Sequence, residues 1–115
     1  MNKRRIISIL IISLLALAVG EYFASGMYLK SVLNSQMNSL LASHDSAKMA
    51  SLAANNSTLK LLEQTSASTR IKDTSDAQGG STNRLYYVTK VDHQNVGVYL
   101  KRTGFLVWKI DEIVK

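Results

Sequence analysis

A cationic start followed directly by a long uncharged stretch constrains this chain more than any other feature. Lys3, Arg4 and Arg5 precede fifteen uncharged, mostly apolar residues, Ile6 to Gly20. This order is typical of an export or membrane-anchoring segment. The positive-inside rule keeps the basic residues on the cytoplasmic side. We therefore expect the chain after about Gly26 to lie outside the cytoplasm, in a bacterial cell envelope.

The same segment allows two interpretations, an uncleaved anchor or a cleaved signal. Residues 6–20 alone would reach about 22 Å as a helix, whereas the hydrocarbon layer is about 30 Å thick. Cleavage could follow Ala18-x-Gly20 or Ala24-x-Gly26. Because apolar and aromatic residues continue the helix, we favour an anchor over residues 1–25, with Glu21 at the outer headgroups. The expected anchor residues are Ile6, Leu10, Leu14, Leu15, Tyr22 and Phe23.

Composition limits the partners and the chemistry. The formal net charge is +6, but residues 1–20 carry +3, residues 21–83 carry zero and residues 84–115 carry +3. Half of the basic excess therefore serves topology, and we expect no nucleic-acid binding. The chain has no cysteine, which excludes disulfides, thiolate catalysis and lipoprotein modification. About ninety residues remain outside the membrane, enough for one small domain.

Residues 26–65 carry a helical pattern. Leu29, Leu33, Met37 and Leu40 recur at spacings of four, four and three, which predicts one amphipathic helix face over residues 26–43. This helix could continue the anchor. Its apolar face could pack on the chain's own sheet, which we favour, or form a coiled coil with a partner. Two short helical segments follow before residue 66.

Residues 66–83 read as a flexible loop. Ile71 is their only large apolar residue, so little burial can offset the entropy of ordering them. A short edge strand could begin at Ile71.

Residues 84–115 are rich in β-branched and aromatic residues and predict a three-stranded antiparallel meander. The expected strands are Leu85–Val91, Val96–Arg102 and Phe105–Val114. Trp108 alternates with Leu106 and Ile110, which predicts a core position for it. Alternatively, it anchors a partner. The predicted fold is therefore α+β, with a transmembrane helix, an amphipathic helix and short helices on a three-stranded or four-stranded meander.

No motif in the chain carries recognisable chemistry. His44 and His93 have no neighbours at metal-ligand spacing, and Asp92-His93 reads as a solvated turn. The serines lie outside known nucleophile motifs, and Gly79-Gly80 lacks the lysine of a phosphate loop. We expect no catalytic residues, no metal, no cofactor and no enzymatic activity.

The ending Gly97-Val98-Tyr99-Leu100-Lys101-Arg102-Thr103-Gly104-Phe105-Leu106-Val107-Trp108-Lys109-Ile110-Asp111-Glu112-Ile113 resembles the final hairpin of small extracytoplasmic members of the nuclear transport factor and cystatin-like α+β roll group. The order of anchor, long helix, the stretch from His44 to Leu52 and a closing meander is similar as well. Some members, such as inner-membrane assembly factors of type IV secretion machines, act as scaffolds. The resemblance implies no catalytic residue.

Two functions follow as expectations. The first is a membrane-anchored scaffold or accessory subunit of an envelope complex, whose partners are the lipid bilayer and other envelope proteins. Leu33, Met37, Leu40 and Trp108 are its candidate core or partner contacts. The second is a secreted ligand-binding or inhibitory module, released by cleavage and using a pocket on the sheet.

Overall fold

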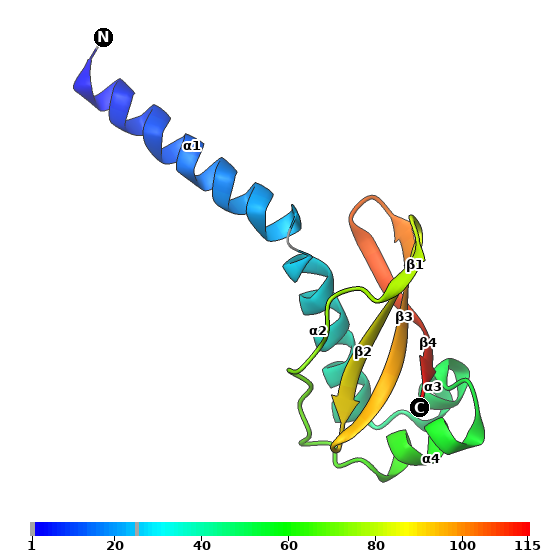
Figure 1. Cartoon of the computed structure of the whole chain (residues 1–115). Helices are drawn as coiled ribbons and strands as arrows, with labels where there is room; N and C mark the ends of the chain where they lie inside the picture. Colours follow the sequence, from blue (N-terminus) through cyan, green and yellow to red (C-terminus); the bar gives the residue numbers. More distant parts are fainter. Residues whose placement is uncertain (1, 25) are drawn as a thin grey trace.

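Four helices and a four-stranded antiparallel sheet make up the described chain (Figure 1). The computed structural model describes residues 2–24 and 26–115, without the side chains of residues 22–24. The helices are α1 Lys3–Ala24, α2 Met27–Ser43, α3 Ser46–Leu52 and α4 Asn56–Gln64. The strands are β1 Gly79–Ser81, β2 Arg84–Val91, β3 Gln94–Gly104 and β4 Val107–Val114. The predicted α+β class and the four-stranded alternative are confirmed.

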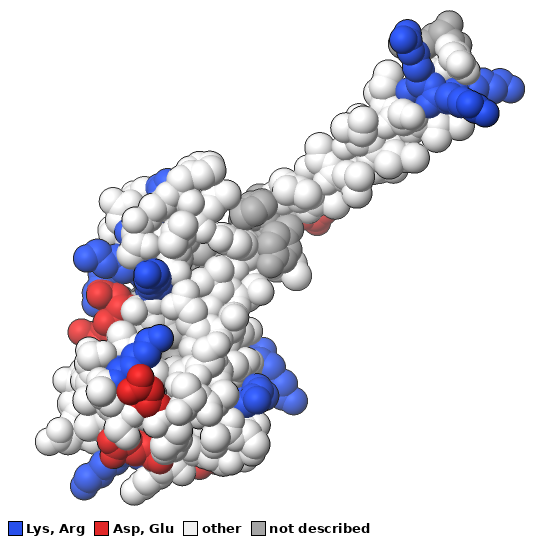
Figure 2. Space-filling model, turned by 180° about the vertical axis from the view of Figure 1, so that it is seen from behind, with Lys and Arg blue, Asp and Glu red and all other residues white. Residues whose placement is uncertain are grey.

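Helix α1 projects from the rest of the molecule as a rod that is uncharged over most of its length, with basic side chains at its far tip and one acidic side chain near its base (Figures 1 and 2). Its large apolar side chains are 43% to 70% exposed. They are Ile6, Ile7, Ile9, Leu10, Ile11, Ile12, Leu14, Leu15, Leu17 and Val19. The side chains of Tyr22 and Phe23, two predicted anchor residues, lie outside the described residues.

Within residues 2–24 and 26–115, no helix is both long enough and apolar enough to cross a membrane. The transmembrane helix expected within residues 1–25 therefore gains no support from the fold.

Helix α2 does not continue α1. Gly26 stands at its N-terminus with φ of 76°. This left-handed backbone conformation is strained for residues with a Cβ atom, and it lets α2 start in a new direction (Figure 1). The expectation of one helix running from the anchor into the domain is thus replaced by two helices.

The amphipathic face of α2 lies against the sheet. Leu33, Met37, Leu40 and Leu41 are buried, and Leu29 packs against them at the margin. The opposite wall of the core comes from alternate residues of β2 and β3, such as Val91, Val96, Val98 and Leu100. Met49, Leu61 and Leu62 of the two short helices close the core at the end farther from α1.

Polar side chains start the two short helices. The Asp45 carboxylate accepts a hydrogen bond from the Lys48 N–H at 3.2 Å, and the Asn55 side chain accepts one from the Thr58 N–H at 2.9 Å. These caps satisfy amides that the first helical turn leaves without backbone partners. The stretch between α3 and α4 then joins the end of β4 through the Ala54 N–H and the Ile113 carbonyl, 2.9 Å apart.

The sheet has the order β1-β2-β3-β4, all antiparallel. Residues Asp92 and His93 form the turn between β2 and β3, both with positive φ. Strand β4 pairs with β3 through two register shifts, one of which leaves Asp111 as an extra residue. This bulge brings both Ile110 and Ile113 to the core, although a regular strand would direct residues three apart to opposite faces.

The fourth strand lies at Gly79–Ser81, not at Ile71. It pairs with Arg84–Tyr86 of β2, so part of the predicted flexible loop belongs to the sheet. Ile71 is instead a buried core residue, 3% exposed.

Candidate functional site

A groove lies between α2 and the start of β4. Its volume is about 510 Å³. The lining combines aromatic, aliphatic and small polar side chains: Tyr28, Ser31, Val32, Ser35 and Gln36 from α2, and Leu106, Val107 and Trp108 from the β3–β4 hairpin. Such a lining suits an extended, partly apolar segment better than a small charged molecule.

Gln36 forms the floor of this groove and completes the outer edge of β4. Its Nε2 donates to the Trp108 carbonyl at 2.7 Å, and the Ile110 N–H donates to its Oε1 at 2.8 Å. One side-chain amide thus takes the place that a neighbouring strand would occupy. The edge of β4 is covered there from within the chain.

Other parts of the chain cover the two ends of β4. At the end nearer α1, the Tyr28 hydroxyl donates to the Leu106 carbonyl in the hairpin turn. At the other end, the Ala54 N–H donates to the Ile113 carbonyl, and the Lys115 N–H donates to the Thr58 hydroxyl at 2.8 Å. Polar groups of α2 and of the α3–α4 region therefore follow β4 along its length.

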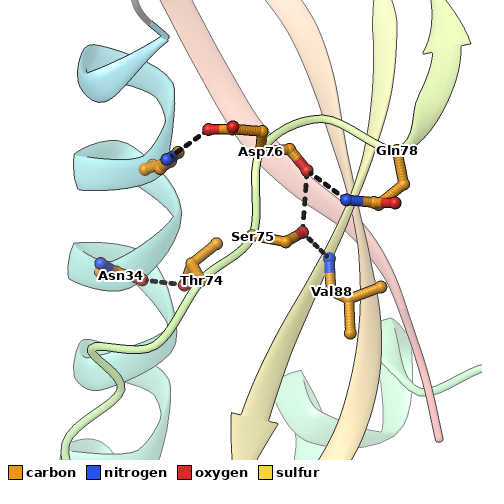
Figure 3. Close-up of polar contacts among 7 residues, drawn as sticks. Asn34, Thr74, Ser75, Asp76, Gln78 and Val88 are labelled. Atoms are coloured by element: carbon orange, nitrogen blue, oxygen red, sulfur yellow. Dashed lines mark hydrogen bonds and ion pairs between the residues drawn. The ribbon is translucent and has the colours of Figure 1, made fainter.

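The opposite edge of the sheet is covered by residues 74–78, which cross from α2 to β2 (Figure 3). Ser75 bonds Val88 twice, because its N–H donates to the Val88 carbonyl at 2.8 Å and its Oγ accepts from the Val88 N–H at 3.0 Å. The Gln78 N–H donates to the Tyr86 carbonyl at 2.7 Å. This stretch extends β1 along β2 without regular strand pairing.

Side chains of α2 hold the same segment from the other side. The Thr74 hydroxyl donates to Asn34 Oδ1 at 2.5 Å, and Lys30 forms an ion pair with Asp76 at 2.5 Å (Figure 3). Further along, the Ile71 N–H donates to Asn38 Oδ1 at 2.6 Å. The polar face of α2, which the sequence left without an assigned role, thus ties the segment before β1 to the domain.

These hydrogen bonds limit how another protein could bind to the edges of the sheet. Strand addition needs an edge with free N–H and C=O groups. In the described chain, groups from α2 and the α3–α4 stretch bond Trp108, Ile110 and Ile113 on the outer edge of β4, and residues 75–78 bond β2 beside β1. The groove beside Trp108 therefore becomes the best candidate for contact with another molecule.

The predicted contact residues separate into two groups. Leu33, Met37 and Leu40 lie in the core. Trp108 is only partly buried, and it packs against the core from the groove. Leu106 belongs to the turn with φ of 55°, so it does not share a strand face with Trp108 and Ile110.

The sequence analysis missed Gln36 and Tyr28 as groove residues. Their role depends on which edge of the sheet α2 follows, and the helical spacing of α2 carries no signal for that edge.

The outer face of the sheet carries a second group of polar and aromatic side chains. The Arg84 guanidinium lies 3.8 Å from the centre of the Tyr99 ring, and its Nε lies 2.9 Å from Asp111 Oδ2. The hydrogen bond to Asp111 raises the pKa of Arg84. On the inner face, burial raises the pKa of Tyr87, and the nearby charge of Asp76 adds to this shift. The surroundings of Arg84 and Tyr87 therefore account for both pKa shifts.

The two histidines lie apart. His44 ends α2, and His93 lies in the β2–β3 turn. Among the described residues, no group of three or more His, Cys, Asp or Glu side chains could hold a metal ion.

Comparison of the chain with protein-family models, with curated proteins and with solved structures finds no match.

Proposed function

We propose that this protein is a single-pass, membrane-anchored scaffold or accessory subunit of a bacterial envelope complex, for example of secretion or conjugation machinery. Its N-terminus would lie in the cytoplasm and its domain outside. It would act through protein–protein contacts rather than catalysis. The resemblance to extracytoplasmic members of the nuclear transport factor and cystatin-like group is part of this proposal.

The observation that carries the proposal is the uncovered apolar surface of α1. A helix that is apolar all round is stable where nonpolar surroundings cover it, yet the large side chains of α1 are exposed on every side. In the described part of the chain, the core cluster takes no residue from α1. A lipid bilayer would supply the missing cover.

The charges of the segment support the same orientation. Lys3, Arg4 and Arg5 lie at one end of α1, and Glu21 lies near the other. The helix has 22 residues, so its full length is about 33 Å. Insertion would use the whole helix, with charged residues in both headgroup regions.

A pair of reporters fused after Lys115 tests location and orientation. We expect activity of a reporter that works only outside the cytoplasm, together with recovery of the chain in the membrane fraction. Leu10→Arg with Leu14→Arg should abolish both results, because two cations in the apolar stretch oppose insertion. Ala47→Arg with Ala50→Arg, on the exposed side of α3, is the matched control and should change neither. Activity of a cytoplasm-only reporter in the unmodified chain would contradict the proposed topology.

The contact function needs its own test at the groove. Val32 lines the groove and is partly buried, so Val32→Arg would place a cation among its apolar side chains. We expect envelope proteins that copurify with the full chain to be lost, while Ser39→Arg on the exposed side of α2 retains them. Equal copurification with both variants would count against the groove.

Release of the domain is the alternative function, and one observation favours it. Because the core lies between Leu29 and Ile113, a product beginning at Met27 would keep it, and the groove could then bind a ligand as part of a secreted module. The mass of the native protein separates the two proposals. An intact N-terminus supports the anchor, and a product beginning near Glu21 or Met27 supports the secreted module.

A further inference from the structure

The tip of the β3–β4 hairpin carries three exposed apolar residues. Phe105 is 81% exposed, Val107 47% and Leu106 44%. Outside α1, Met27 is the only other exposed large apolar side chain in the described chain. An apolar cluster on an otherwise polar surface indicates a contact with something nonpolar.

The backbone of the tip places an apolar residue in an unfavourable conformation. Phe105 and Leu106 form the turn between Gly104 and Val107, and Leu106 adopts φ of 55°. Glycine, asparagine or aspartate normally occupies such a left-handed position, because a branched side chain is disfavoured there. Neither water nor the backbone thus favours the leucine, and nonpolar surroundings outside the domain would offset this cost.

The tip lies at the end of the domain nearest α1. Figure 1 shows the hairpin turn at this end and α3, α4 and the C-terminus at the other. The Tyr28 hydroxyl holds the Leu106 carbonyl, and Tyr28 lies in the first turn of α2, directly after the α1–α2 junction. The exposed side chain of Met27 lies at the same end. A membrane that held α1 would therefore pass close to the tip.

Basic side chains follow the tip along both strands. Lys101, Arg102 and Lys109 are exposed. Lys101 and Lys109 are cross-strand partners, and like charges directly opposite one another are destabilising. Figure 2 shows basic side chains close to an uncharged lobe at this end of the domain. An apolar tip with cations behind it matches the layered chemistry of an anionic membrane surface.

We propose that Phe105, Leu106 and Val107 enter the headgroup region of a membrane that contains anionic phospholipid, while Lys101, Arg102 and Lys109 contact its phosphate groups. This inference rests on the proposed membrane anchor. The hairpin becomes a second attachment point that fixes the orientation of the domain and brings the groove beside Trp108 to the membrane surface.

The test uses the absence of cysteine from the chain. Phe105→Cys in the full-length protein is labelled with an environment-sensitive fluorophore and reconstituted into vesicles of phosphatidylcholine with phosphatidylglycerol. Asn95→Cys, exposed at the opposite end of β3, is the matched control. We expect blue-shifted emission and quenching by lipid-borne nitroxides at position 105 but not at position 95. Substitution of Lys101, Arg102 and Lys109 by glutamine should reduce the blue shift and the quenching at position 105. The same substitution of Lys48, Lys60 and Lys90 should leave both unchanged.

The outcomes separate this inference from the anchor. If the protein floats with the vesicles but emission and quenching are the same at positions 105 and 95, the proposed hairpin contact is wrong and the proposed anchor is retained. A blue shift without quenching by lipid nitroxides would mean that protein covers the tip, which also overturns the inference. If the protein does not float with the vesicles, the anchor itself fails. Val107→Cys repeats the measurement, and circular dichroism of each variant verifies its fold.

Discussion

Helix α1 exposes its apolar side chains, whereas the domain from α2 to β4 buries most of its own. In α1 they face outward, and Leu10 is 57% exposed. In the domain they face inward, and Leu100 is fully buried. The domain also bonds β4 and β2 with Gln36 and Ser75, whereas α1 contacts α2 and contributes no residue to the core cluster of the described chain. One chain therefore contains a self-sufficient part and a part whose apolar surface needs an external environment.

The largest effect expected from this difference concerns the same substitution in both parts. Leu100→Ala should lower the free energy of unfolding of the domain by about 2–5 kcal/mol, because it leaves a cavity in a fully packed site. Leu10→Ala should change the same quantity by less than about 0.5 kcal/mol. Urea unfolding of the full chain in detergent, followed by Trp108 fluorescence, measures both. A comparable loss for Leu10→Ala would mean that α1 packs on the domain.

A second prediction locates the border between core and groove. Because Trp108 is only partly buried, Trp108→Ala should cost about 1–3 kcal/mol, less than truncation of a fully buried tryptophan. Thermal unfolding followed by circular dichroism measures this cost, with exposed Val107→Ala as the control. A loss of unfolding free energy as large as that of Leu100→Ala would mean that Trp108 is a core residue.

A third prediction concerns the segment that covers the edge of β2. Asn38→Ala removes the hydrogen bond to the Ile71 N–H and should cost about 1 kcal/mol. The segment should then open more often, so trypsin should cleave faster after Arg70 and Lys72. Ser39→Ala, on the exposed side of α2, should leave the cleavage rate unchanged. Equally fast cleavage in the unmodified chain would support the flexible loop that the composition predicts.

The smallest expected effect is confined to alkaline pH. Burial raises the pKa of Tyr87 in the folded domain, so the folded state holds its proton more tightly than the unfolded state. This contribution to stability is complete below about pH 10, the ordinary tyrosine pKa, and is lost as pH rises through the folded-state value. Unfolding free energies measured across this range should fall less steeply for Tyr87→Phe than for the unmodified chain. Identical slopes would contradict the assigned burial effect.

Periodicity made the helices and the meander predictable. Leu33, Met37 and Leu40 lie one or two turns apart, and their burial follows from that spacing alone. The β-branched and aromatic residues of residues 84–115 indicated three strands in the same way. Both signals are local, because residues two apart in a strand, or three and four apart in a helix, share one face.

The remaining features depend on contacts between distant parts of the chain. Gly79–Ser81 has little strand propensity and becomes β1 through pairing with β2. The bulge at Asp111 changes which residues of β4 face the core, and that shift moves Trp108 toward the groove. Gln36 reads as an ordinary polar residue of a helix until β4 lies beside it. The spacing of residues along the sequence cannot predict these long-range contacts.

The covered sheet edges have a consequence for crowding. If α1 confines the protein to a membrane, copies diffuse in two dimensions and meet far more often than they would in solution. Open edges under such conditions would invite strand pairing between copies and the growth of aggregates. Gln36 and Ala54 bond the edge of β4, and Ser75 bonds β2. Fewer backbone groups are then open to such pairing, so domains that collide separate more readily and remain available to their partners.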